Sequence, residues 1–545
     1  MIAVAVALVL WIPALLGLGS AARRLFVGDA LPDGDEASLA VTGFLGLLAL
    51  SVAGTALHFF APVGTAFSGV AVALGLVFLG RFGRSLTRNL VPLDVAVFGA
   101  LLLALSVLAS GPVRLHDTGL YHQPALSWFP AGPLPVGLAN LHLRFGLNSA
   151  WFPAAAFLGL PGIEGSSAPV ASALILFFFG TAVFRGLKSC VAGTPDASRL
   201  LLGLGALPLV VLALNEGVPS LSTDLPAAAL TILSAHFLLR SPGTPSERGA
   251  AVVLAFFAVL VKLSALVFFV GTLLVTRTFA WGLAGAAAIW GARGVALSGY
   301  LLYPFAMTRL TFLPWAAPEG LARDEIAWAR SWARLPGVRP GDVLSGWGWL
   351  GPWIRQTVPR LSVLALLIFL VSGLVALWLA ARRPPPAGGE SRRGRIRAVA
   401  LIAILSTAYW FVSAPDPRFG FGALYVLAAL PLASALPRLG WRSLSVGRRA
   451  ALLGLAFGAC AAAGLVFLIA GPGLRANALV PAASPRPELG PMRTSAGETI
   501  FVPAADDRCW AAPVPCTPYF REDLVVRRDS AGRIRGFSLP VPVTQ

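Results

Sequence analysis

The strongest constraint on this chain is a series of long apolar runs that recurs along almost its whole length. Apolar residues make up 57% of the 545 residues and charged residues only 12%, whereas a soluble domain is about half apolar and about a quarter charged. Because one crossing of a bilayer needs roughly 20 apolar residues, the chain holds enough apolar sequence for about ten or more helices. The composition excludes a soluble enzyme, a disordered chain and a coiled coil, and it predicts an all-α polytopic membrane protein.

The runs predict about 12–14 transmembrane helices, which form a domain over residues 1–471. They lie near residues 2–20, 38–60, 63–80, 90–110, 166–183, 200–215, 226–240, 250–261, 264–276, 280–297, 361–380, 398–413, 423–436 and 450–471. The two runs on either side of Lys262 have two interpretations, which are two separate spans or one long kinked helix.

Positive charge in the short loops predicts the orientation. The net charge is +18, and the only lysines are Lys188 and Lys262, so nearly all basic residues are arginine. Arginine gathers in short loops, most densely in residues 382–397, and such loops are cytoplasmic under the positive-inside rule. Because this distribution follows membrane topology, we exclude a nucleic-acid partner. Alternation of the spans then places four segments outside: 111–165, 216–225, 298–360 and 472–545.

Two of the outer segments are expected to have structure of their own. Within 298–360, residues 318–335 form an amphipathic pattern with tryptophans among charges, which is typical of helices in the membrane interface. This helix either seals the bundle or guides a lipid substrate into a cavity. The segment 472–545 predicts a small extracytoplasmic domain that contains β-structure. In an oxidising compartment Cys509 and Cys516 would form a disulfide; two free thiols and a metal pair are the alternatives.

The first outer segment, 111–165, concentrates polar and titratable side chains to a degree that is unusual in so apolar a chain. Asp117 and Tyr121 are four positions apart, so on a helix they share one face. A carboxylate at this place can act as general base on an acceptor hydroxyl. The candidate catalytic residues are Asp117, His116, Tyr121 and His122. The alternative is that Asp117 caps the following helix and that the surrounding histidines and arginines form a structural network.

The sequence assigns no metal ligands and no certain cofactor. The spacing of His116, Asp117 and His122 matches no zinc motif. A divalent cation held by Asp and phosphate oxygens stays open. The phosphate-binding pattern Gly-x-x-x-x-Gly-Lys-Ser/Thr does not occur in the chain, so energy would come from an activated donor or from a gradient.

A larger set of side chains is suited to hold a phosphate group, because Arg, Lys and His neutralise its charge. The candidate substrate-binding residues are Arg114, His142, Arg144, Asn148, Asp224, Lys262, Arg293 and Arg418. Lys262 and Arg293 lie in apolar runs, where ionisable side chains are functional-site hypotheses by default. Structural alternatives remain: Asp224 can be a helix cap, Lys262 can reach the interface, and Arg418 can form a local turn with Asp416.

The pattern Asp117-x-x-x-Tyr121, in the first large outer loop of a many-span protein, resembles the Asp-Glu-x-x-Tyr motif of GT-C membrane glycosyltransferases. This resemblance implies a GT-C-like fold, an Asp base and a polyprenyl-phosphate-linked sugar donor used on the outer face. Thr118 stands where that family often has Glu, and three predicted spans precede the one that leads into this loop, where that family usually has one.

The whole chain also resembles a group of large uncharacterised bacterial inner-membrane proteins. The strings that carry this second resemblance are HDTGLYH, GLANLHLRFGLNSAWF, VKLSAL, SGYLLYP, APDPRFGFG and CWAAPVPCTPY. It implies a multi-pass protein of the bacterial inner membrane with an extracytoplasmic C-terminus, and it brings no activity.

From these features we expect a glycosyltransferase that moves a sugar from a lipid-linked donor to a glycan, lipid or protein acceptor of the cell envelope, in contact with membrane lipid. Three alternatives stay open: a transporter or flippase of a lipid-linked or small substrate, an O-antigen-type polymerase or ligase, and a structural or assembly protein. The sequence shows no internal repeat of the kind common in transporters.

Overall fold

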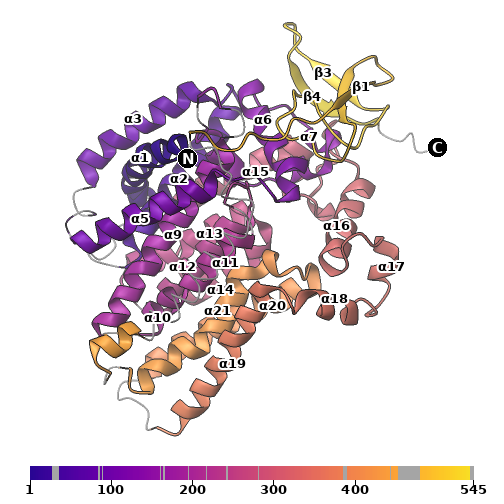
Figure 1. Ribbon diagram of the computed structural model, residues 1–545. Helices are drawn as coiled ribbons and strands as arrows, with labels where there is room; N and C mark the ends of the chain where they lie inside the picture. Colours follow the sequence, from indigo (N-terminus) through magenta and orange to yellow (C-terminus); the bar gives the residue numbers. More distant parts are fainter. Residues whose placement is uncertain are drawn as a thin grey trace.

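The computed structural model describes residues 1–27, 36–83, 86, 88, 90–159, 161–163, 166–193, 196–215, 218–240, 243–279, 281–383, 390–441, 444–451 and 479–540. Within these residues the chain is a bundle of helices with a small β region near its C-terminal end (Figure 1). Apart from its first two positions, the predicted span near 450–471 lies outside the described residues.

Eight helices in the described residues are long and apolar enough to cross a membrane. They are α1 (Ile2–Phe26), α2 (Ser38–His58), α3 (Thr65–Phe82), α5 (Pro92–Ala109), α9 (Ser167–Ala192), α19 (Leu361–Ala381), α20 (Glu390–Ser413) and α21 (Pro417–Ala435). Most of α9 is buried, whereas α3, α5, α19 and α20 expose much of their apolar surface. Exposed leucines and valines on such helices fit contact with lipid. The predicted multi-pass membrane protein of mainly helical fold is confirmed.

Several predicted spans are shorter or more polar helices. They are α10 (Ala197–Leu204), α11 (Ala206–Asn215), α12 (Asp224–Arg240), α13 (Pro245–Val261), η3 (Leu263–Ala265), α14 (Leu266–Thr276) and α15 (Trp281–Ser298). The run near 200–215 is therefore two helices, with Gly205 between them. At Lys262 the chain turns back, because the rings of Phe256 and Phe269 lie 5.5 Å apart on either side of it. This contact excludes the single kinked helix and leaves two antiparallel helices.

Glycines let the first helices approach one another closely. A Cβ atom on Gly17 of α1 would lie 1.7 Å from the carbonyl oxygen of Gly75 in α3, and one on Gly46 of α2 would lie 2.2 Å from the carbonyl oxygen of Leu15. Small residues at such crossings allow backbone-to-backbone packing in membrane proteins. Glycine at positions 17 and 46 therefore allows α1, α2 and α3 to pack with their backbones in close contact.

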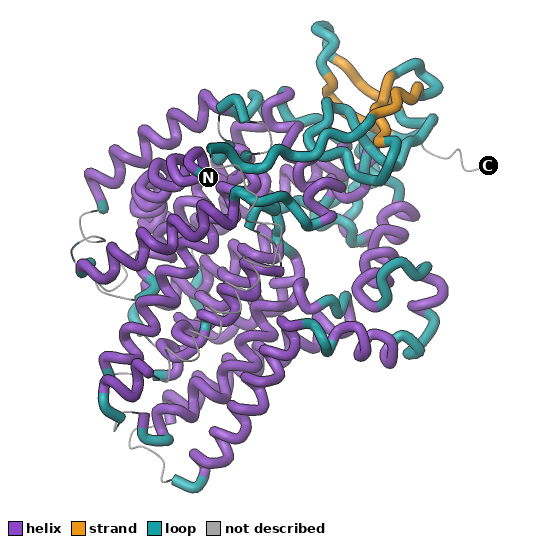
Figure 2. Tube along the Cα trace, in the orientation of Figure 1, coloured by secondary structure: helices purple, strands orange, loops and turns teal. Residues whose placement is uncertain are grey.

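Short helices cover the end of the bundle that carries the β region (Figures 1 and 2). The first outer segment forms the π-helical segment η1 (Thr118–His122), α6 (Gln123–Ala131), α7 (Leu138–Leu141), η2 (Leu143–Gly146) and α8 (Trp151–Ala156). The Trp-rich segment, residues 298–360, forms η4 (Ala306–Thr308), α16 (Glu319–Arg334), α17 (Pro340–Leu344) and α18 (Leu350–Thr357). The short η5 (Leu436–Arg438) follows α21.

The β region consists of two antiparallel pairs. Strand β1 (Leu489–Arg493) pairs with β2 (Thr499–Pro503), and β3 (Val525–Arg528) pairs with β4 (Ile534–Ser538). The predicted disulfide is present and joins Cys509 to Cys516.

The β region packs directly on the first outer segment. The backbone N–H of Phe537 donates to the carbonyl oxygen of Val136 at 2.8 Å, and the Trp128 and Phe537 rings meet edge to face with centroids 5.7 Å apart. In the disulfide loop, the N–H of Trp510 donates to the carbonyl oxygen of Gly119 in η1 at 2.9 Å. The β region is therefore built onto the segment that holds the candidate catalytic residues.

Candidate functional site

Six charged side chains meet where the outer segments cover the bundle. We call Asp117, Arg144, Asp224, Lys262, Glu325 and Arg418 the charge cluster. Arg418 Nη2 lies 3.0 Å from Asp117 Oδ2, and Arg144 Nη1 lies 3.5 Å from Asp117 Oδ1. Arg144 Nε also donates to Glu325 Oε1 at 3.0 Å, and Lys262 pairs with Asp224. Three acids and three bases give the cluster no net formal charge.

Local structure aims the two arginines at Asp117. The N–H of Arg144 donates to Nδ1 of His142 at 3.1 Å, at the start of η2. The N–H of Arg418 donates to the Asp416 carboxylate, which caps α21. Asp117 precedes η1, but its side chain makes no capping hydrogen bond. Its carboxylate faces arginines instead, so the helix-cap interpretation of Asp117 does not describe the structure.

Phe419 connects the two halves of the charge cluster. The Lys262 ammonium lies 3.9 Å from the centroid of the Phe419 ring, and the Arg418 guanidinium lies 4.9 Å from the same centroid. Lys262 itself has extended backbone where α13 ends, so its side chain leaves the helix pair at the turn. The Lys262 ammonium therefore contacts Asp224 and Phe419, in place of the predicted alternative in which it only reaches the membrane interface.

Burial and charge act in opposite directions on Asp117. Burial alone would raise the pKa of its carboxyl, but the positive charges of Arg418 and Arg144 outweigh burial and hold the pKa below its usual range. Asp117 is thus ionised at neutral pH. Burial raises the pKa of Tyr121 well above its usual value, and the Arg144 guanidinium lies 5.5 Å from the centroid of the Tyr121 ring. Arg144 therefore contacts both members of the Asp117–Tyr121 pair.

His122 and His142 are buried neutral side chains beside the charge cluster. Burial lowers the pKa of each histidine to about 3. Both ring nitrogens of His122 have no hydrogen-bond partner in the described part of the chain. His142 orients Arg144 through Nδ1. His142 therefore orients Arg144, whereas the His122 ring lies buried beside the cluster with its two nitrogens unsatisfied within the described residues.

Three further predicted residues, His116, Arg293 and Asn148, contact partners other than Asp117. His116 points to the β region, with its Nε2 2.9 Å from Asp507 Oδ1. Arg293 donates to Asn148 Oδ1 at 2.8 Å, between α15 and the first outer segment. Arg114 lies in the extended segment before η1. The contacts of His116, Arg293 and Asn148 are therefore separate from the ion pairs of the charge cluster, although Arg293 and Arg144 line one small cavity.

A small cavity opens beside the charge cluster, between α12, α14, α20 and α21. Asp224, Ser264, Trp410, Arg418 and Phe419 contribute to its lining, and its volume is about 30 Å³. That volume admits one or two water molecules. A larger ligand would need the surrounding helices or outer segments to move apart.

The Trp-rich segment contacts the charge cluster at Arg144 and also contacts the chain between α20 and α21, just before Arg418. Glu325 of α16 reaches Arg144, as described above, and Arg334 at the other end of α16 donates to the carbonyl oxygen of Val412 at 2.9 Å. Trp353 Nε1 donates to the carbonyl oxygen of Pro415, just before α21, at 2.9 Å. The tryptophans that stay exposed on this segment are Trp328, Trp332 and Trp347.

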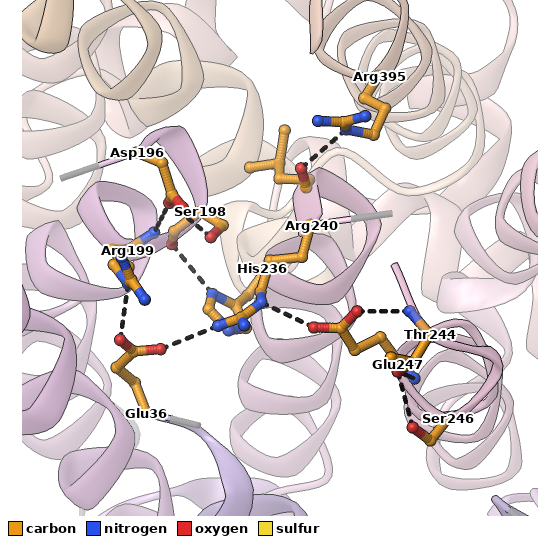
Figure 3. Close-up of polar contacts among 11 residues, drawn as sticks. Glu36, Asp196, Ser198, Arg199, His236, Arg240, Thr244, Ser246, Glu247 and Arg395 are labelled. Atoms are coloured by element: carbon orange, nitrogen blue, oxygen red, sulfur yellow. Dashed lines mark hydrogen bonds and ion pairs between the residues drawn. The ribbon is translucent and has the colours of Figure 1, made fainter. Parts of the chain in front are cut away.

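A second polar cluster lies at the other end of α12 (Figure 3). Glu36 accepts from Arg199 Nε at 2.7 Å, from Ser189 Oγ at 2.8 Å and from Arg240 Nη1 at 3.0 Å. Arg240 Nε also donates to Glu247 Oε1 at 3.0 Å. Since α12 begins at Asp224 and ends at Arg240, the two clusters are about 25 Å apart along the helix. The second cluster ties together the ends of α9, α10, α12 and α13.

Sequence reasoning missed Glu325 and Phe419 as members of the site. Glu325 lies within the predicted amphipathic helix, and Phe419 directly follows the predicted site residue Arg418, so both are close in sequence to features that the pattern indicates. In the described part of the chain, His, Cys, Asp and Glu side chains form no group of three that could hold a metal ion.

The fold and the cluster define a multi-pass membrane protein with a charge-balanced polar site under outer segments. The chain belongs to the family described as "Domain of unknown function (DUF8201)", whose model matches residues 1–425. The match includes every member of the charge cluster and stops before the β region. No curated protein matches the chain, and no solved structure matches it. The expected membership of an uncharacterised family is confirmed; the resemblance to GT-C enzymes stays a prediction.

Proposed function

We propose that the protein is a membrane glycosyltransferase of GT-C type that uses a lipid-linked sugar phosphate as donor. The observation that carries this proposal is the ionised Asp117 carboxylate between two arginines, next to the buried His122, whose ring nitrogens have no hydrogen-bond partner among the described residues. Arginine forks match phosphate oxygens, and a carboxylate can take the proton of an acceptor hydroxyl.

The pairing of Asp117 with arginine suggests how donor binding would prepare the base. In the structure the arginines keep the pKa of Asp117 low, and a carboxylate of low pKa is a weak base. A donor phosphate that takes over Arg418 and Arg144 would remove that effect and raise the pKa of Asp117. The donor would therefore both neutralise the arginines and strengthen the base.

The reaction then balances without a redox partner. The acceptor hydroxyl oxygen attacks the anomeric carbon of the sugar, and the bond from that carbon to the phosphate oxygen breaks. The bonding electrons stay on the leaving phosphate, next to Arg144, Arg418 and Lys262. The hydroxyl proton passes to the Asp117 carboxylate. By resemblance to the GT-C enzymes, the configuration at the anomeric carbon is inverted.

The exposed tryptophans supply a route for a lipid donor. Trp328, Trp332 and Trp347 lie on the segment that also contacts the charge cluster through Glu325. Tryptophan favours the headgroup level of a bilayer, so a lipid phosphate arriving at this depth would meet Arg144. The disulfide supports an oxidising compartment for this end, and we place it outside the bacterial inner membrane.

Mass spectrometry of envelope glycans and polyprenyl lipids tests the proposal. The host expresses wild-type protein, Asp117→Asn, the matched control Asp523→Asn, or an empty vector, at equal protein levels in the membrane. Asp523 is an exposed acid of the β region that also pairs with an arginine. We expect a hexose-sized mass gain on one acceptor with the wild type and the control, but not with Asp117→Asn.

Two results would count against a glycosyltransferase. If all four profiles match while lipid-linked donor is present, no sugar is transferred. If the leaflet distribution of lipid-linked sugars changes without any new glycoside, the protein is a transporter or flippase instead.

A further inference from the structure

A half-exposed tyrosine of the β region stands at the edge of the charge cluster. Tyr519 is 51% exposed, and its ring meets the His142 ring edge to face with centroids 5.1 Å apart. Because His142 also orients Arg144, one side chain separates Tyr519 from the charge cluster. Burial raises the pKa of the Tyr519 hydroxyl, and the nearby charge of Arg144 opposes that rise. Much of an aromatic side chain is therefore open to solvent close to the candidate site.

Two polar side chains continue this surface toward Asp117. His116 directly precedes Asp117, and its Nε2 lies 2.9 Å from Oδ1 of Asp507. The side chains of this pair are 54% and 42% exposed, and the charge of Asp507 adds to the rise in the pKa of Tyr519. We call Tyr519, Asp507 and His116 the Tyr519 surface. Since the Asp117 side chain is 20% exposed, part of the candidate base is open to solvent beside this surface.

The chain around Tyr519 is held in place without any ligand. The disulfide between Cys509 and Cys516 closes just before it. The N–H of Tyr519 donates to Oγ1 of Thr517 at 3.2 Å, and the N–H of Thr517 donates to the carbonyl oxygen of Phe501 in β2 at 3.0 Å. A surface that is already ordered loses little conformational freedom when it binds a ligand.

The edges of β4 and β2 that face the first outer segment and the disulfide loop are already paired. The N–H of Val136 donates to the carbonyl oxygen of Arg535 at 3.0 Å, and its own carbonyl oxygen accepts from Phe537. Next to β2, the N–H of Phe501 donates to the carbonyl oxygen of Pro515 at 3.0 Å. A peptide that binds as an added strand needs a free edge. Recognition at this place therefore falls to side chains.

We infer that the Tyr519 surface binds the acceptor of the proposed transfer and that this acceptor is a carbohydrate. The inference rests on the proposed function. The apolar face of a sugar ring packs on an aromatic side chain, and sugar hydroxyls donate to carboxylate oxygens such as those of Asp507. A lipid acceptor would instead need apolar side chains here, where the surface carries an imidazole and a carboxylate.

Donor and acceptor would then reach Asp117 through different parts of the molecule. Arg418 and Lys262 belong to the helix bundle, where a lipid-linked donor would arrive from the membrane. Tyr519 and Asp507 belong to the β region, which lies over α6 and α7 at one end of the bundle (Figure 1). The β region would therefore select the acceptor, and the bundle would select the donor.

An oligosaccharide array measures acceptor binding apart from sugar transfer. The full-length protein in detergent is applied to an array of bacterial envelope oligosaccharides as wild type, Asp117→Asn, Tyr519→Ala, or the matched control Asp523→Asn. We expect the wild type, Asp117→Asn and the control to bind at least one oligosaccharide saturably. Tyr519→Ala should lose affinity by about tenfold because it removes the ring, whereas Tyr519→Phe keeps the ring and should retain most of the binding. Asp507→Asn should also weaken binding.

The outcomes separate this inference from the proposed function. Binding that Tyr519→Ala loses supports the carbohydrate surface even if mass spectrometry finds no transferred sugar, in which case only the glycosyltransferase proposal fails. The inference is overturned if no oligosaccharide binds, or if Tyr519→Ala binds as well as the wild type, whether or not sugar is transferred. Where transfer is seen, Tyr519→Ala should raise the KM for the acceptor and leave the KM for the donor unchanged; the reverse pattern also overturns the inference.

Discussion

The ion pair between Asp117 and Arg418 allows a quantitative test of how the charge cluster is held together. At 3.0 Å and an effective dielectric constant of about 20, two unit charges attract by roughly 5–6 kcal/mol before desolvation is counted. The two side chains are 20% and 22% exposed, so water screens part of this attraction. We expect a net coupling free energy of about 1–2 kcal/mol.

A double-mutant cycle isolates this coupling. Asp117→Asn leaves the cluster with a net charge of +1 and should lower the free energy of unfolding by about 2–3 kcal/mol. Arg418→Gln should also destabilise, because it removes one of two arginine partners of Asp117. The double variant restores neutrality, so its loss should be smaller than the sum of the single losses. The free energies are measured by denaturant titration in mixed micelles.

An exposed pair provides the control for this cycle. Arg521 and Asp523 lie 2.9 Å apart but are 39% and 47% exposed, and such surface pairs couple by about 0–1 kcal/mol. If the Asp117 and Arg418 losses add within about 0.5 kcal/mol, the reasoning is refuted. The cluster would then be held by its surroundings and not by its charges.

Three further predictions concern burial, helix packing and the β region. His122→Phe should flatten the acid side of the stability curve: the folded pKa of His122 is about 3 against about 6.5 unfolded, so wild-type stability falls as pH drops below about 6.5, by up to about 1.4 kcal/mol per pH unit. An unchanged slope in pH-dependent unfolding would contradict this. Gly17→Val should lower the melting temperature strongly because its side chain would collide with α3, whereas Gly80→Val, on an open face of α3, should leave it nearly unchanged; equal effects would argue against the packing. Replacing Cys509 and Cys516 together by Ser should destabilise the β region by about 2–3 kcal/mol, and reducing agent should reproduce that loss in the wild type but not in the variant, as followed by limited proteolysis.

The sequence predicted those features that depend on local pattern. The apolar runs gave the helices because each must satisfy its own backbone in lipid. Lys262 stood out as a lone cation in an apolar run, and the structure places it at a turn, paired with Asp224. The disulfide followed from two nearby cysteines in a polar tail. In each case the prediction rests on residues that are close in sequence or on the amino-acid composition of one segment.

Features that depend on distant contacts could not be predicted in this way. Glu325 joins the charge cluster only because α16 packs over η2, and no periodicity reports which face of an interfacial helix meets an arginine. That Arg293 meets Asn148 and Phe129 likewise depends on residues far from it in the sequence. The four-residue spacing of Asp117 and Tyr121 predicts that they share one face of an α-helix. In the structure the π-helical segment η1 follows Asp117 instead. Arg144 contacts both side chains.

The attachment of the β region to the first outer segment has a consequence for biosynthesis. The Asn140 amide donates to the carbonyl oxygen of Phe537, 397 positions later in the chain. At about 5–20 residues per second, the ribosome needs roughly 20–80 s to make that stretch. Over this interval the other members of the charge cluster are synthesised one after another, while the cover that fixes η1 is still missing. A stalled or truncated chain would therefore expose an unfinished site, and only full translation and oxidation of Cys509 and Cys516 would complete it.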